Sequence, residues 1–146
     1  MLSAGTNVQW LVEDLGLIAS PAASHEVAAS VASTDGVTYV PALLGLGTPR
    51  WDFGARGTLL GVTRGTTAAH VVRAVLDGVA QRAVDLVEAA ESDTGLAIGT
   101  LRVDGGMSSN PTFVQAVADL SGRSVEVSPI AEATTLASRA RKGVAS

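Results

Sequence analysis

The stretch AAHVVRAVLDGVAQRAVDLVEAAE, residues 68–91, carries the clearest periodicity in the chain. Its apolar side chains recur every three or four positions, and its charged side chains lie between them. The apolar stripe consists of Val72, Val75, Leu76, Val79, Ala83, Leu86 and Val87. This spacing predicts a long amphipathic helix that buries one face.

The residues that follow predict a strand, a turn and a second helix. Segment 98–103 (IGTLRV) is expected to be a buried strand, and Asp104-Gly105-Gly106 a tight turn. A helix is expected over 111–120, and its apolar residues Phe113, Val117 and Leu120 are expected to face the core.

The remainder of the chain after this helix predicts one more strand and one more helix. Gly122 is suited to end the preceding helix, and residues 125–127 are expected to be a strand. Segment 132–146 starts like a helix but becomes basic around Arg139, Arg141 and Lys142. Because three cationic side chains are costly to bury, we expect that last segment to be exposed or frayed.

The residues before the long helix predict two short helices and a strand. A helix is expected over 7–15, preceded by a turn of small residues, and Ser24 is expected to cap a second helix that ends near Asp35-Gly36. A short strand is expected at 37–41, followed by an irregular loop rich in glycine. Strands alternating with helices predict a single-domain α/β fold.

Composition excludes several classes of function. The 146 residues are 47% hydrophobic and carry a formal net charge of −4, with ten scattered Lys and Arg residues. No basic patch for nucleic acid or an anionic membrane is present, and no run is long enough to span a bilayer. The chain has no cysteine, which excludes disulfides and agrees with a reducing cytoplasm.

Two turns of small residues are candidates for ligand binding. The Asp104-Gly105-Gly106 turn either presents backbone N–H groups to an anion or a nucleotide, or only reverses the chain. Asn110, four residues later, either caps the next helix or bonds a purine edge, and capping is favoured. Ala4-Gly5-Thr6 with Gln9 repeats the arrangement, so the two turns either flank one ligand or are unrelated caps.

The other polar candidates have simpler structural interpretations. His25 and His70 have no neighbouring ligands at metal-binding spacing, so both are interpreted as surface or capping residues, and no metal site is expected. Asp52 is expected to bond its own backbone. Arg56 and Arg64 are expected to bind carbonyls or carboxylates rather than phosphate.

Several motifs in a fixed order resemble one known family. GTLLGV at 57–62, HV at 70–71 and AVLD at 74–77 resemble the second signature of the FGGY carbohydrate kinases. Further matching segments are PALLGLGTP at 41–49, WD at 51–52, ARG at 55–57, LGVTRG at 60–65 and RVDGG at 102–106. These segments resemble the glycerol kinases more than the xylulose or gluconate kinases of the family.

The resemblance implies a fold and a set of ligands. It implies the C-terminal lobe of a two-lobed kinase with the actin-like ATPase (ribonuclease H-like) α/β fold, truncated at its N-terminal side, so that 1–146 is a partial domain. By similarity, Gly5, Gln9, Gly106 and Asn110 contact the nucleotide, with ATP and Mg²⁺ as cofactors. The family's catalytic Asp base lies upstream of the residues present, so no catalytic residue is assigned in this chain.

The implied function is the ATP-dependent phosphorylation of glycerol to glycerol 3-phosphate within a larger kinase. The expected partners are the nucleotide and an N-terminal kinase lobe, the isolated chain is expected to be inactive, and an uncovered apolar face makes a homo-oligomer possible. Two alternatives remain: a non-catalytic remnant or docking module of a decayed kinase, and a related sugar or polyol kinase.

Overall fold

The computed structural model describes residues 4–129 of the chain. In chain order the elements are α1 (Ala4–Glu13), α2 (Ala23–Ala29), β1 (Thr38–Val40), β2 (Thr58–Leu60), α3 (Ala68–Thr94), β3 (Thr100–Val103), the 3-10 helix η1 (Gly106–Ser109), α4 (Pro111–Ser121) and β4 (Ser124–Val127). The helix expected after residue 132 lies outside the described residues.

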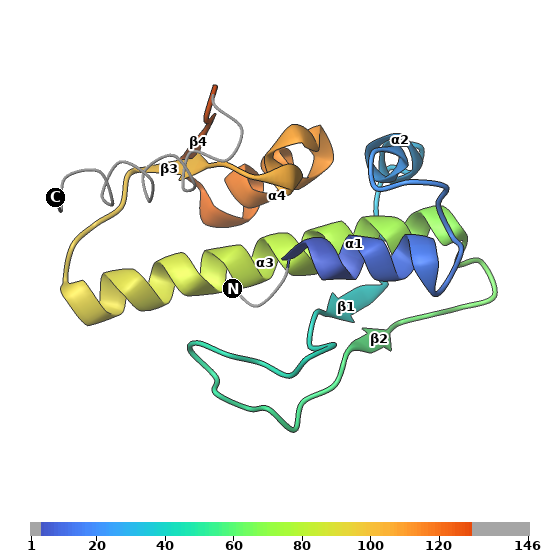
Figure 1. The fold of residues 1–146 in the computed structure, drawn as a ribbon, viewed down its shortest axis with the longest axis horizontal. Coiled ribbons are helices and arrows are strands. Elements are labelled where there is room, and N and C mark those ends of the chain that lie inside the picture. The colour runs from blue at the N-terminus through green and yellow to red at the C-terminus, as the bar shows by residue number, and fades with distance from the viewer. Residues whose placement is uncertain (1–3, 130–146) are drawn as a thin grey trace, which may run out of the picture.

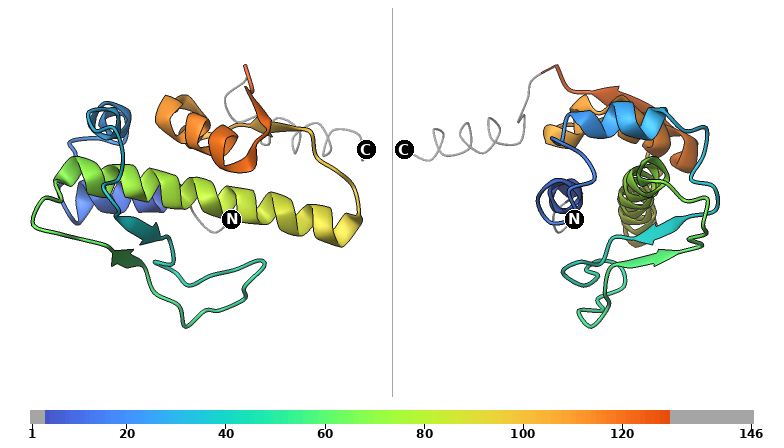
Figure 2. Two further views of the ribbon diagram at one scale, coloured as in Figure 1. Left: turned by 180° about the vertical axis from the view of Figure 1, so that it is seen from behind. Right: turned by 90° about the vertical axis from the view of Figure 1, so that its right-hand side faces the viewer.

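Helix α3 is the central element of the fold. It runs the length of the molecule, with α1 beside it, α2 and α4 on one side and the β1–β2 hairpin on the opposite side (Figures 1 and 2). Viewed end on, α3 is surrounded by these elements (Figure 2). The fold is therefore organised around a helix rather than around one large sheet.

The ends of α3 are fixed by local capping. The Thr67 side chain and His70 form a capping box, in which His70 Nδ1 accepts a hydrogen bond from the Thr67 backbone N–H at 3.0 Å. Gly95 ends the helix in the left-handed conformation, with φ of 68°. The capping interpretation of His70 is confirmed, and α3 covers the whole of the helix predicted over 68–91.

The buried face of α3 follows the predicted stripe for most of its length. Its buried residues are Val72, Ala74, Val75, Leu76, Val79, Ala80 and Val84. Ala83, Leu86 and Val87, which were expected to be buried, are only half-buried, because few elements cover the last turns of the helix.

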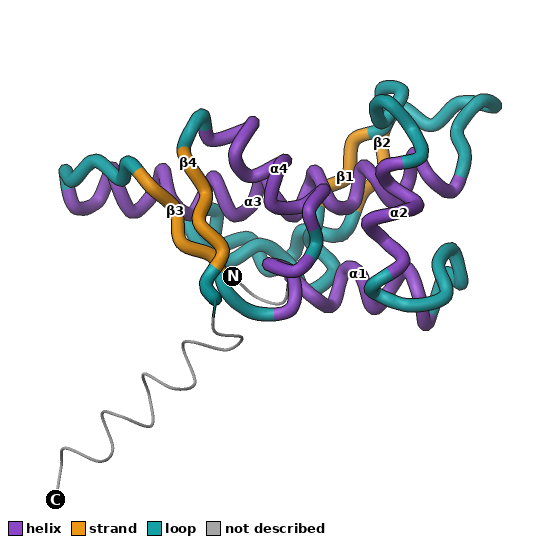
Figure 3. The backbone as a smooth tube through the Cα atoms, turned by 90° about the horizontal axis from the view of Figure 1, so that it is seen from above, coloured by secondary structure: helices purple, strands orange, loops and turns teal. Residues whose placement is uncertain are grey.

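Two small sheets complete the architecture. Strands β1 and β2 pair antiparallel, with Tyr39 opposite Leu59, and β3 and β4 pair parallel, with Leu101 opposite Val125 (Figure 3). Strand β2 was not predicted. Strand β3 was expected to be buried, but only Leu101 in it is buried, because β4 is its one partner among the described residues.

Three predictions at the helix termini are wrong. Helix α1 begins at Ala4, so Gly5 lies in its first turn and not in a turn before it. Ser24 lies inside α2, which begins after Ala22 and ends at Ala29, well before Asp35. Leu120 in α4 was expected to face the core, but it is 46% exposed and lines a cavity between α3 and α4.

The core consists of two apolar clusters along α3. One joins the first half of α3 to α1, α2 and β1, and the other joins its second half to β3 and α4. Met107 of η1 packs against both clusters. The segment around η1 is thereby fixed between the two clusters, next to the start of α1. Within residues 4–129, no helix combines the length and apolarity needed to cross a bilayer.

Candidate functional site

A cavity of about 530 Å³ lies between α1, the start of α2 and the η1–α4 segment. It is lined by Gly5 and Gln9 from α1 and by Gly106 and Asn110 from the η1–α4 segment. The structure therefore brings together the four residues expected to contact a nucleotide, although about a hundred positions separate the two pairs in the sequence.

The turn at 104–106 has the backbone that its sequence predicts. Gly105 has φ of 86°, a backbone conformation that residues with a Cβ rarely adopt. Gly106 begins η1, so a 3-10 turn separates it from α4. A Cβ at Gly5 or at Gly106 would meet no atom within 4 Å, which leaves open space over both glycines.

Asn110 caps helix α4, as its position before Pro111 indicates. Its Oδ1 accepts a hydrogen bond from the Phe113 backbone N–H at 3.1 Å, and its Nδ2 donates to the Ser24 Oγ at 2.9 Å. Ser24 in turn donates to the Pro21 carbonyl at 2.6 Å. Because both ends of the amide have partners, Asn110 is held in one orientation at the edge of the cavity.

The lining of this cavity suits a neutral ring better than a phosphate. Its walls include Val8, Met107 and Pro111, with polar groups from Gln9 and Asn110. No Lys or Arg is among the described residues that line it. A planar heterocycle that is apolar on its faces and polar at its edge matches such a lining, whereas a phosphate would lack a cationic partner there.

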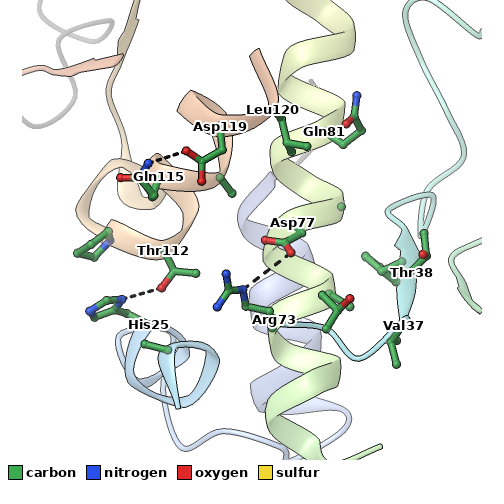
Figure 4. Close-up of a pocket in the computed structure, with 17 residues that line it drawn as sticks. His25, Val37, Thr38, Arg73, Asp77, Gln81, Thr112, Gln115, Asp119 and Leu120 are labelled. Carbon is green, nitrogen blue, oxygen red and sulfur yellow. Dashed lines mark hydrogen bonds and ion pairs between the residues drawn. The ribbon is translucent and has the colours of Figure 1, made fainter. Parts of the chain in front are cut away.

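A larger cavity of about 730 Å³ lies between α2, β1, α3 and α4 and was not predicted from the sequence (Figure 4). Arg73 and Asp77 project into it from α3, and Asp119 lines it from α4. Burial raises the pKa of Asp77, Arg73 lowers it and the charge of Asp119 raises it further. Its residues come from four separate elements, so no local pattern in the sequence indicates it.

His25 forms part of the wall between the two cavities, since it lines both. Its Nδ1 lies 2.8 Å from the Thr112 Oγ1, which connects α2 to the first turn of α4. The sequence interpretation of His25 as a surface or capping residue misses this contact, which spans 87 positions.

The remaining polar candidates have structural roles. Asp52 Oδ1 accepts hydrogen bonds from the backbone N–H groups of Gly54 and Ala55, at 2.9 and 3.1 Å, as expected. Arg56 donates to the carbonyls of the three residues before it, also as expected. Within residues 4–129, no group of three or more His, Cys, Asp or Glu side chains is placed to hold a metal ion.

The chain is similar to known proteins over nearly its whole length. The C-terminal domain of the FGGY family of carbohydrate kinases matches residues 1–138. A glycerol kinase of Burkholderia ambifaria is 49% identical over 142 residues, which cover 97% of this chain and 28% of that protein. A glycerol kinase of Burkholderia pseudomallei is likewise 49% identical, with the same coverage. The chain thus spans 28% of the length of these relatives.

Solved structures show the same fold. The crystal structure of Plasmodium falciparum glycerol kinase with ADP superposes with a TM-score of 0.84 at 38% identity, covering 91% of this chain and 26% of that one. The xylulose kinase of Rhodospirillum rubrum gives a TM-score of 0.74 at 29% identity, covering 96% and 29% of the two chains.

The fold, the sequence motifs and these similarities lead to one assignment. The α/β architecture is that of the C-terminal lobe of an actin-like ATPase, in which a long helix leads into a parallel strand pair. The chain belongs to the FGGY family of carbohydrate kinases and corresponds to the C-terminal domain of that family.

Proposed function

We propose that this chain is the nucleotide-binding part of a kinase that uses ATP to phosphorylate glycerol to glycerol 3-phosphate. The observation that carries the proposal is the cavity shared by Gly5, Gln9, Gly106 and Asn110. Its partly apolar lining, which includes Asp104 but no Lys or Arg among the described residues, favours a nucleobase over a phosphate. The similarity to a glycerol kinase solved with ADP, at 38% identity, supports the same use.

The proposed division of labour follows from the groups that the cavity lacks. The described lining of the cavity holds the base but offers no Lys or Arg for the phosphates, so another segment supplies those contacts. Residues 4–129 also offer no cluster of metal ligands, so Mg²⁺ enters bound to the nucleotide phosphates. On this proposal the catalytic base and the residues that hold glycerol belong to an N-terminal lobe, and a span of 28% of the relatives' length leaves room for such a lobe. On this division, residues 1–146 form a partial domain of the larger kinase.

Calorimetry with a non-hydrolysable ATP analogue tests the proposed cavity. Gly106→Val adds a side chain in open space at the cavity wall without a strained backbone, and we expect it to weaken binding about tenfold or more. Gly99→Val is the matched control, because its Cβ also meets nothing and Gly99 does not line the cavity. Equal weakening by both variants, or no binding by the wild-type chain, would contradict the proposal.

Activity measurements test the division of labour and the substrate. We expect no glycerol-dependent ADP formation from the chain alone, and activity after an N-terminal lobe of the family is added. A panel of polyols and sugars in the same assay decides between glycerol and the pentulose substrates of the xylulose kinases that share the fold. Glycerol-dependent turnover by the chain alone would show that the base is not supplied from outside.

A further inference from the structure

Ser24 is fully buried in the wall of the cavity, and its hydroxyl connects two distant segments. It donates a hydrogen bond to the Pro21 carbonyl at 2.6 Å and accepts one from Asn110 Nδ2 at 2.9 Å. The second bond spans 86 positions in the sequence. A hydroxyl has one proton, so once that proton is given to Pro21 the oxygen can only accept from Asn110.

The cap at α4 sets the same orientation of the Asn110 amide. The Phe113 N–H has no acceptor within the helix, so it requires the oxygen end of the amide. With the oxygen facing the first turn of α4 and one N–H bound to Ser24, the amide retains one N–H. Because the oxygen end of the amide faces the first turn of α4, the group that we expect Asn110 to present to a ligand in the cavity is its remaining N–H.

The two anchors have different effects. The bond to Phe113 decides which end of the amide faces the helix, and the bond to Ser24 fixes the rotation of the amide about its Cβ–Cγ bond. Without Ser24, one amide N–H is left inside the protein with no acceptor, and the amide rotates to satisfy it.

We infer that Ser24 is a positioning residue of the nucleotide cavity, which holds the Asn110 amide so that its free N–H faces a ring nitrogen of the base. This inference rests on the proposed function. A ring nitrogen accepts a hydrogen bond, whereas the exocyclic amino group of adenine donates one and would meet another donor at Asn110. The contact therefore selects for the acceptor edge of a purine.

Calorimetry of ATP against its 1-deaza, 3-deaza and 7-deaza analogues tests the inference on the full chain. Each analogue replaces one ring nitrogen by a C–H group that accepts no hydrogen bond. We expect the wild-type chain to bind one of the three about five- to tenfold more weakly than ATP. The readout is the affinity for ATP divided by the affinity for the deaza analogue that binds most weakly. A general structural defect weakens the binding of all nucleotides by the same factor and leaves this ratio unchanged.

Three variants separate positioning from stability. Ser24→Ala removes the anchor and is expected to bring the ratio close to one. Asn110→Asp keeps an oxygen that accepts from the Phe113 N–H but has no N–H of its own to donate to a ligand. It is therefore also expected to bring the ratio close to one. Ser30→Ala is the matched control, because Ser30 follows α2, donates to the Val27 carbonyl at 2.6 Å and does not line the cavity.

Each remaining outcome has one meaning. If the wild-type chain binds ATP but does not distinguish the deaza analogues, or if Ser24→Ala keeps the wild-type ratio, the inference is overturned and the proposed function stands. If the wild-type chain binds no nucleotide, the proposed function fails and the inference fails with it.

Discussion

At the scale of single residues, Tyr39 shows how burial of one polar group affects the whole fold. It is the only tyrosine in the chain, it is 4% exposed, and its hydroxyl donates to Asn7 Oδ1 at 2.7 Å. Its ring stacks on Trp10, with centroids 6.0 Å apart. Burial raises the pKa of Tyr39 from 10.0 to about 12.

This shift predicts that stability falls at alkaline pH. Between pH 10 and about 12 the unfolded chain loses the phenol proton while the folded chain keeps it, so the unfolded state binds fewer protons. Stability from this group is fully present below pH 10 and decreases by about 2 kcal/mol as the pH reaches 12. Urea unfolding over this pH range measures the decrease. Tyr39→Phe has no phenol proton and should therefore lose this part of the pH dependence of stability.

Phenolate absorbance provides an independent check, because no other tyrosine contributes to it. A native titration midpoint near 10 would show that the Tyr39 hydroxyl is not held in a desolvated site.

Single residues also show the limit of what the sequence predicts. The cap at Asn110 was predictable, because an Asn before a Pro at a helix start is a local pattern. The contact of Asn110 with Ser24 was not, because it depends on α2 and α4 lying side by side. Ser24 was instead expected to cap α2, since a hydroxyl at a helix start has the same local pattern whether or not a distant partner exists.

At the scale of elements, the helices were predicted better than the strands. The stripe in α3 is long enough to determine the helix by itself, and both of its ends have local caps. Strand β2 has three residues within a glycine-rich segment and exists through its pairing with β1, so the local sequence does not indicate it. Helix α1 starts earlier than predicted because Gly5 was interpreted as a turn residue, although nothing near it requires one.

The close packing of α3 on β1 leads to a second prediction. Gly78 lies in the middle of α3, and a Cβ there would overlap the backbone carbonyl oxygen of Tyr39. Alanine favours a helix over glycine by about 1 kcal/mol, but the overlap forces β1 away from the helix. We expect Gly78→Ala to lower the free energy of unfolding by about 1 to 3 kcal/mol in urea.

Gly5→Ala is the control for helix propensity, since Gly5 is also helical and a Cβ there meets no atom within 4 Å. It is expected to leave stability unchanged or to raise it by less than about 1 kcal/mol. A Gly78→Ala variant as stable as the wild type would show that α3 and β1 are not in close contact.

At the scale of the whole molecule, the described surface carries apolar side chains that no described element covers. The largest group of exposed apolar side chains lies in the segment 44–62, which includes β2 and the loop before it. Leu44, Trp51, Phe53, Leu60 and Val62 are between 56% and 65% exposed there. The chain spans 28% of the length of its relatives, and in the larger kinase that we propose, we expect a further segment to pack on this surface.

The last prediction concerns what this surface does when the chain is alone. Apolar side chains that remain in contact with water favour association, so we expect the purified chain to form oligomers that increase in size with concentration. Sedimentation velocity measures this. Replacing Leu44 and Phe53 by Ser together should shift the chain toward a monomer, whereas Leu96→Ser should not, although Leu96 is 69% exposed, because it lies after the far end of α3. A wild-type chain that stays monomeric at high concentration and unfolds cooperatively would contradict the prediction, because its exposed apolar loop would then be stable in water without a partner.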